Sequence, residues 1–127
     1  MNDRIEQYIL RLVERSTPDI TAWNLEKIRE GKPTTWNYID GCMLTALFSM
    51  TDITGDSRYA AFAERVTDHF VRENGEILTF DPEKRQLDDI NEGQVLFPVY
   101  QMTGKEKYRK AAEMLHRTLE QQPRTPE

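Results

Sequence analysis

Four acidic and polar side chains stand together in the sequence LDDINEG, residues 87–93: Asp88, Asp89, Asn91 and Glu92. One interpretation is functional. It makes Asp88 a carboxylate held at the mouth of a ring of helices, where the loops between helices line a cavity. The other is structural, because acids favour the positive N-terminus of a helix and Asn is a good N-cap. Composition alone favours the helix start.

A second candidate group is aromatic. Trp36 and Tyr38 flank Asn37, just before a predicted helix. Their rings could form walls on which a sugar stacks, or they could anchor a loop in the core. Their spacing alone favours the core.

Other catalytic chemistry has little support in the sequence. His69 and His116 lie on different predicted hairpins, each without a second ligand at metal spacing, so helix-surface positions are expected for both. The sequence contains no P-loop, GxSxG, GxGxxG or HExxH motif, so no cofactor and no metal are expected. The single Cys42 excludes an intramolecular disulfide and a thiolate zinc cage. Beside Gly41, it is expected to be a small packed residue.

Charge and hydropathy narrow the class of protein. The 127 residues carry 17 Lys+Arg against 22 Asp+Glu, a formal net charge of −5, and no basic cluster, which argues against nucleic-acid binding. No apolar run approaches the ~20 residues of a membrane helix. The charged, periodic N-terminus does not resemble a signal peptide. With one cysteine, these features predict a soluble cytoplasmic protein.

Hydrophobic periodicity predicts helices throughout the chain. The first carries an apolar stripe and ends near Ser16, and a less regular one follows over about 20–29. A third spans about 36–53 and is closed by Gly55, because glycine enters the left-handed cap without steric cost. A fourth covers 57–73. A polar loop follows from residue 75, with a short extended segment at 77–80.

The most informative feature is an internal repeat. The 25 residues from Ala46 align without a gap on those from Val95, an offset of 49 residues. Both copies read as helix, Thr-Gly turn, helix, with a Tyr one turn beyond the Gly. The repeat predicts two helical hairpins, over 46–70 and 95–119, that stack because one hairpin cannot bury its apolar face alone. Pro98, inside the second copy, predicts a kink or a late helix start after Gly93.

The period of the repeat indicates the architecture. Tetratricopeptide, ankyrin and HEAT units are shorter, whereas 49 residues with bulky aromatics suit the helical hairpins of an α/α toroid. Six such hairpins would need roughly 300 residues. Residues 1–127 are therefore expected to be a single all-α segment, the N-terminal part of an incomplete α/α barrel.

Five motifs occur in an order and at a spacing that resemble those of glycoside hydrolase family 105. They are W-x-Y-x-x-G at Trp36–Gly41, T-G-D-x-x-Y at Thr54–Tyr59, L-D-x-I-N-x-G at Leu87–Gly93, T-G-x-x-K-Y at Thr103–Tyr108 and P-R-T at Pro123–Thr125. This family comprises the unsaturated rhamnogalacturonyl hydrolases and is related to the family 88 unsaturated glucuronyl hydrolases.

The resemblance implies an (α/α)6 barrel that removes a 4,5-unsaturated uronic acid from pectin oligosaccharides. Family members protonate the ring double bond and add water at the neighbouring carbon, and the resulting hemiketal breaks down. Asp88 matches the first active-site carboxylate of the family. Trp36 and Tyr38 match its aromatic motif near the sugar, and Asn91 is expected to bind substrate.

The sequence also departs from the family. The family continues into G-G-F-W-H-K and W-L-D-G-L, whose Asp is the general acid/base, whereas this chain stops at Glu127. The 127 residues alone are therefore expected to be inactive. A non-catalytic helical-repeat module, or an inactive remnant of such a hydrolase, is the alternative. An open barrel edge around Leu115 and Leu119 is expected to favour self-association or marginal stability.

Overall fold

The computed structural model describes residues 3–81, 90 and 92–120, and of Tyr38 and Glu92 it describes the backbone alone. The elements in this part of the chain are α1 (Asp3–Glu14), α2 (Leu25–Glu30), α3 (Tyr38–Thr54), α4 (Ser57–Phe70), the 3-10 helix η2 (Glu92–Val95), α6 (Leu96–Thr103) and α7 (Glu106–Glu120). Within the same ranges the only β-structure is an isolated bridge between Val71 and Ile77. The predicted all-α class is confirmed.

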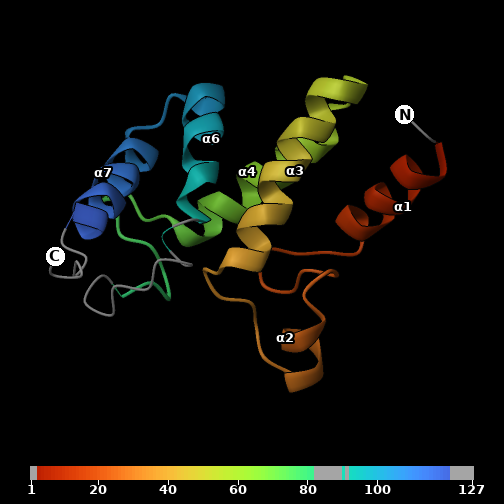
Figure 1. Cartoon of the computed structure of the whole chain (residues 1–127), viewed down its shortest axis with the longest axis horizontal. Helices are drawn as coiled ribbons and strands as arrows, with labels where there is room; N and C mark the ends of the chain where they lie inside the picture. Colours follow the sequence, from red (N-terminus) through yellow and green to blue (C-terminus); the bar gives the residue numbers. More distant parts are fainter. Residues whose placement is uncertain (1–2, 82–89, 91, 121–127) are drawn as a thin grey trace, which may run out of the picture.

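The two predicted hairpins are present and turn at the predicted glycines. α3 and α4 form the first and α6 and α7 the second, as Figure 1 shows. Gly55 and Gly104 have φ values of 75° and 67°, a left-handed conformation that favours glycine, and each donates its N–H to the carbonyl four residues earlier. The threonines before them, Thr54 and Thr103, hydrogen-bond carbonyls of their own helices at 2.8 and 2.9 Å. The two copies of the repeat thus end their first helices with the same hydrogen bonds and the same glycine conformation.

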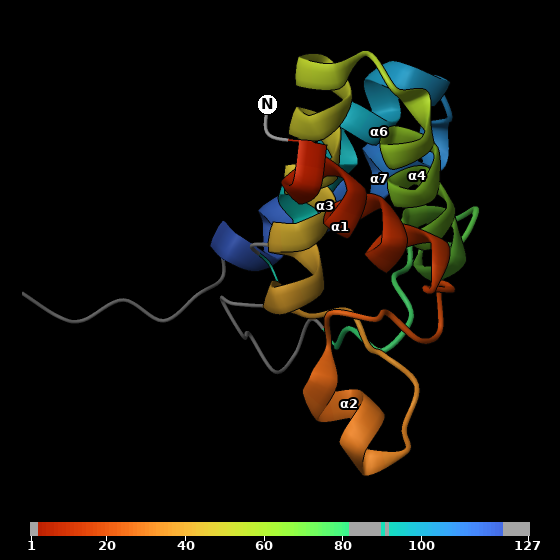
Figure 2. The same cartoon turned by 90° about the vertical axis from the view of Figure 1, so that its right-hand side faces the viewer.

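The helices stack in two series. α1, α4 and α7 form the first series, in which α4 packs on α1 and is linked to α7 by polar contacts (Figures 1 and 2). α3, η2 and α6 form the second series, in which η2 contacts both α3 and α6. The two series also touch each other, since α4 packs on α6. The repeated tyrosines fasten the first series. The Tyr59 hydroxyl lies 3.3 Å from the carbonyl of Glu6, and the Tyr108 hydroxyl lies 3.4 Å from Asp68 Oδ1. Tyr59 on α4 therefore hydrogen-bonds α1, and Tyr108 on α7 hydrogen-bonds α4.

One core joins both hairpins. Its largest fully buried side chains are Trp36, Tyr59, Tyr108, Phe70, Leu44, Leu47, Leu96, Val66, Val71, Val95 and Val99. Leu47 is related to Leu96, and Tyr59 to Tyr108, by the 49-residue offset, so equivalent positions of both hairpins contribute to the same core. None of the helices in the described ranges is long and apolar enough to cross a membrane.

Two expected boundaries differ in the structure, and a third agrees. α2 begins at Leu25 rather than near residue 20, because the preceding residues form turns and Thr21 hydrogen-bonds Asp40. α4 ends at Phe70, where the chain becomes extended and Val71 bridges Ile77. The late start predicted from Pro98 is confirmed, since α6 begins only after η2 and a proline near a helix start sacrifices no hydrogen bond.

An ion-pair network connects the two hairpins. The buried Lys107 Nζ contacts Asp68 Oδ1 and lies 3.8 Å from Glu73 Oε1. The hydrogen bond from Lys107 lowers the pKa of Asp68. Burial, and then the nearby carboxylate of Asp68, raise the pKa of Tyr108, which therefore stays a neutral donor.

This network predicts an acid-sensitive contribution to stability. The lowered pKa of Asp68 stabilises the fold above the unfolded-state value of about 4, and this stabilisation is lost as the pH falls through the folded-state pKa. Asp68→Asn is expected to lower the free energy of unfolding by about 1 kcal/mol at pH 7, a value that allows for solvent screening. Urea unfolding of both proteins should show this difference shrinking below about pH 4. Glu73→Gln, which alters a far more exposed partner, is the control, and a difference independent of pH would contradict the assignment.

Candidate functional site

The described residues of the motifs W-x-Y-x-x-G and L-D-x-I-N-x-G lie at the end of the molecule opposite the Thr-Gly turns. Here the start of α3, the segment 77–81 and η2 come together, in the lower part of Figure 1. η2 packs against α3. The elements that carry W-x-Y-x-x-G and the end of L-D-x-I-N-x-G are therefore neighbours.

A long-range hydrogen bond joins two of these segments. The backbone N–H of Trp36 donates to Thr79 Oγ1 at 2.8 Å. Thr79 has φ 64°, and among the described residues it alone has positive φ without being glycine. A β-branched residue is strained in that conformation, and such strain concentrates at functional sites. Thr79 thus fixes the position of segment 77–81 against the residues before α3.

A buried carboxylate organises the start of α3. Asp40 is 1% exposed. Its Oδ1 accepts hydrogen bonds from Thr21 Oγ1 at 3.0 Å and Trp23 Nε1 at 2.7 Å. Its Oδ2 accepts from Asn37 Nδ2 at 2.7 Å and from the hydroxyl of Thr34. These four donors give each carboxylate oxygen two hydrogen bonds, and we call them and Asp40 the Asp40 network.

The Asp40 network is a positioning device. It ties the segment 17–35, which contains α2, to the first turn of α3, beside the residues of the aromatic motif. Asn37 completes it as the N-cap, since its Oδ1 accepts from the backbone N–H of Asp40 at 2.9 Å. Sequence reasoning missed Asp40. The signal that could have revealed it is an acid three residues after an Asn N-cap, the spacing of a capping box.

The structure describes the four predicted site residues to different extents. The predictions for Asp88 and Asn91 lie outside the described residues. Tyr38 begins α3, and its side chain is not described. Trp36 is 2% exposed and packs edge-to-face on Phe70, with ring centroids 6.0 Å apart. The Trp36 side chain is thus part of the core, and its role in substrate binding stays a prediction.

The remaining candidates carry little chemistry. His69 lies 2.9 Å from Asp19 Oδ1, and His116 lies 2.9 Å from Glu120 Oε1, both at the surface. In the described part of the chain no three His, Cys, Asp or Glu side chains cluster as metal ligands would. Cys42 is exposed, so the expectation that it is packed is wrong. Cys42 lies on the exposed side of α3, whereas the neighbouring residue, Gly41, is buried.

Comparison with known proteins relates this arrangement to carbohydrate-active enzymes. The family model "Glycosyl Hydrolase Family 88" matches residues 11–127. The structure is similar to that of a glycoside hydrolase from family 105 of C. acetobutylicum ATCC 824, with a TM-score of 0.75 and 26% sequence identity. The match covers 94% of this chain and 30% of that one. The relationship suggested by the motifs is confirmed, as is the all-α fold class built of helical hairpins.

Proposed function

The chain belongs to glycosyl hydrolase family 88, and we propose that its residues supply part of the site of an unsaturated rhamnogalacturonyl hydrolase. The proposed substrates are oligosaccharides from pectin that end in a 4,5-unsaturated uronic acid. The chain spans 30% of the length of the family 105 structure that it resembles. We therefore propose that residues 1–127 form one segment, the N-terminal part of an incomplete barrel.

The proposed reaction is hydration of the double bond. A general acid adds a proton to one carbon of the double bond, a water molecule adds its hydroxyl to the neighbouring carbon, and the remaining proton of the water returns to the deprotonated acid. The hemiketal formed in this way opens and releases the attached sugar with its oxygen. Asp88 orients the sugar or stabilises the positive charge that develops on the ring, while Tyr38 and Asn91 bind the substrate. The proton comes from the acid of the family segment W-L-D-G-L, which this sequence does not contain.

One observation supports this proposal most strongly. Two motifs of the family resemblance, far apart in the sequence, meet at one end of the fold. The packing of η2, whose first two residues end the second motif, on α3, whose first turn belongs to the first motif, brings their described residues together. The Asp40 network links Asp40 and Asn37 of the first motif to the side chains of three residues before it. A positioned site of this kind is what preorganised catalysis requires.

The nature of the substrate provides the test. A polypeptide in which these residues are followed by the family acid segment is expected to act on unsaturated rhamnogalacturonan disaccharide, with loss of the double-bond absorbance. The saturated disaccharide is the matched control, because it has no double bond to protonate. Release of the attached sugar is measured for both disaccharides, and equal release from both would contradict hydration and indicate direct displacement at the anomeric carbon.

We further propose that the protein acts in the cytoplasm, which its single cysteine supports. A second candidate function is a non-catalytic module that binds a partner, which would include an inactive remnant of such a hydrolase. One observation favours this candidate, namely the apolar face that the α6–α7 hairpin exposes.

A further inference from the structure

Thr79 adopts a backbone conformation that its residue type disfavours. Its φ of 64° is left-handed and brings the Cβ close to the following carbonyl oxygen, whereas glycine, without a Cβ, adopts this conformation freely. The residues on both sides are fixed. The N–H of Leu78 donates to the carbonyl of Phe70 at 2.8 Å. The N–H of Phe80 donates to the carbonyl of the buried Ile77 at 3.3 Å, so the surrounding turn imposes the strained conformation.

The hydroxyl of Thr79 makes a long-range hydrogen bond. Its Oγ1 accepts from the backbone N–H of Trp36 at 2.8 Å, across 43 positions of the sequence. The indole of Trp36 packs on Phe70, the residue whose carbonyl also fixes Leu78. Glycine at position 79 would relieve the strain, but it would remove the acceptor of this hydrogen bond. The residue type therefore favours the bond to Trp36 over an unstrained turn.

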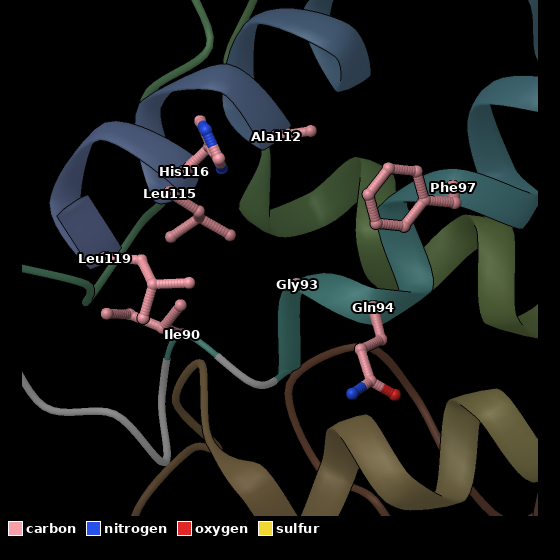
Figure 3. Close-up of a pocket in the computed structure, with 8 residues that line it drawn as sticks. All are labelled: Ile90, Gly93, Gln94, Phe97, Ala112, Leu115, His116 and Leu119. Atoms are coloured by element: carbon pink, nitrogen blue, oxygen red, sulfur yellow. The ribbon is translucent and has the colours of Figure 1, made fainter.

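The neighbouring η2 is held by a different contact. A Cβ on Gly93 would lie 2.3 Å from Leu115 Cδ1, so a side chain at this position would require Leu115 to move. Figure 3 shows both residues in the lining of a groove of about 240 Å³. Leu115 itself is buried, so the expectation that it is bare at the open edge is wrong. Because η2 is placed by its packing on α7, Thr79 is expected to act on the start of α3 alone.

We propose that Thr79 is a positioning residue of the site, which holds the start of α3 in the place that substrate binding requires. This inference rests on the proposed function, in which Tyr38, the first residue of α3, binds the substrate. The Asp40 network secures the first turn of α3, and the bond from Trp36 to Thr79 secures the residues directly before it. Backbone strain is concentrated at functional sites, where it contributes to preorganisation.

Kinetics of a polypeptide that continues into the family acid segment, the parent here, test this role. Thr79→Val removes the hydroxyl and keeps the shape of the side chain. It is expected to raise KM for unsaturated rhamnogalacturonan disaccharide about tenfold, the effect of one hydrogen bond. The value of kcat should change by less than about twofold, because a displaced binding residue weakens the binding of substrate and transition state alike. Thr79→Ser keeps the hydroxyl and should retain the parental KM.

Two further variants separate positioning from stability. Thr79→Gly relieves the strain as it removes the hydroxyl, so it should melt close to the temperature of the parent and still show the raised KM. Thr54→Val is the matched control. The Thr54 hydroxyl also makes a hydrogen bond, at 2.8 Å to the carbonyl of Met50, but it lies at the opposite end of the molecule. This variant should lower the melting temperature and leave KM unchanged.

The outcomes distinguish this inference from the proposed function. A parent without turnover would overturn both. A parent with turnover whose KM is unchanged by Thr79→Val and Thr79→Gly would overturn the positioning role alone. A KM raised equally by Thr79→Val and Thr54→Val would also overturn it, because the effect would then follow from lower stability. A raised KM in Thr79→Ser would overturn it as well, since the hydroxyl would not be the group responsible.

Discussion

Asp40→Ala is expected to lower the free energy of unfolding by about 3 kcal/mol, the largest effect on stability expected of any substitution considered in this chain. The substitution leaves four donors, from Thr21, Trp23, Thr34 and Asn37, without their acceptor in a buried site. An unsatisfied buried donor costs about 1–3 kcal/mol, and part of this cost is recovered as hydroxyls rotate and water enters. A domain is stable by only about 5–15 kcal/mol, so the loss is severe.

Thermal unfolding measures this effect, with an expected fall in the melting temperature of about 10 °C. Asp52→Ala is the matched control, because Asp52 lies on the same helix and is exposed, and it should change stability by less than about 0.5 kcal/mol. Asp40→Asn should lie between the two. Its amide accepts hydrogen bonds at one end only, and its NH2 group opposes that of Asn37. Equal stability of the Asp40→Ala and Asp52→Ala variants would contradict a role for the Asp40 network.

The largest effect on activity is expected from Asp88→Asn in a polypeptide that also carries the family acid segment. The substitution keeps the shape of the side chain and removes its charge. If the carboxylate stabilises positive charge that develops on the sugar ring, the rate falls by about a hundredfold or more. The loss should appear mainly in kcat, because charge develops in the transition state rather than in the bound substrate.

Asp89→Asn is the control for this prediction. Asp89 is the neighbouring carboxylate of the same motif, and a helix start is the simpler interpretation of its position. Its substitution should change the rate by only a few-fold. If Asp89→Asn abolished the reaction while Asp88→Asn left it intact, the roles of the two residues would be exchanged.

The hairpins could be predicted from the sequence because their determinants are local and repeated. The 49-residue offset, the left-handed glycines and the apolar periodicity each specify the same helices. Gly55 and Gly104 end their helices for the same reason, and Pro98 delays α6 as its missing N–H requires. Consistent local signals of this kind allow a fold to be predicted from a single sequence.

The polar core of the candidate site could not be predicted in the same way. The Asp40 network joins residues up to 19 positions apart through side-chain hydrogen bonds that have no periodicity. It also draws residues 20–24 out of the helix that their sequence suggests. Thr79 adopts a left-handed conformation that its residue type disfavours, and the long-range contact with Trp36 accompanies it. Contacts of this kind arise from tertiary structure, which local pattern does not encode.

The most direct test of the account is the loss of double-bond absorbance from unsaturated rhamnogalacturonan disaccharide. It should be measured in parallel for the 127-residue chain and for a polypeptide that continues into the family acid segment. A positioned general acid contributes about 10²–10⁴-fold, so we predict no turnover by the chain alone, turnover by the longer polypeptide, and loss of that turnover on Asp88→Asn. Clear turnover by the 127 residues alone, or an Asp88→Asn polypeptide as active as its parent, would contradict the proposed division of the chemistry between this segment and the rest of the barrel.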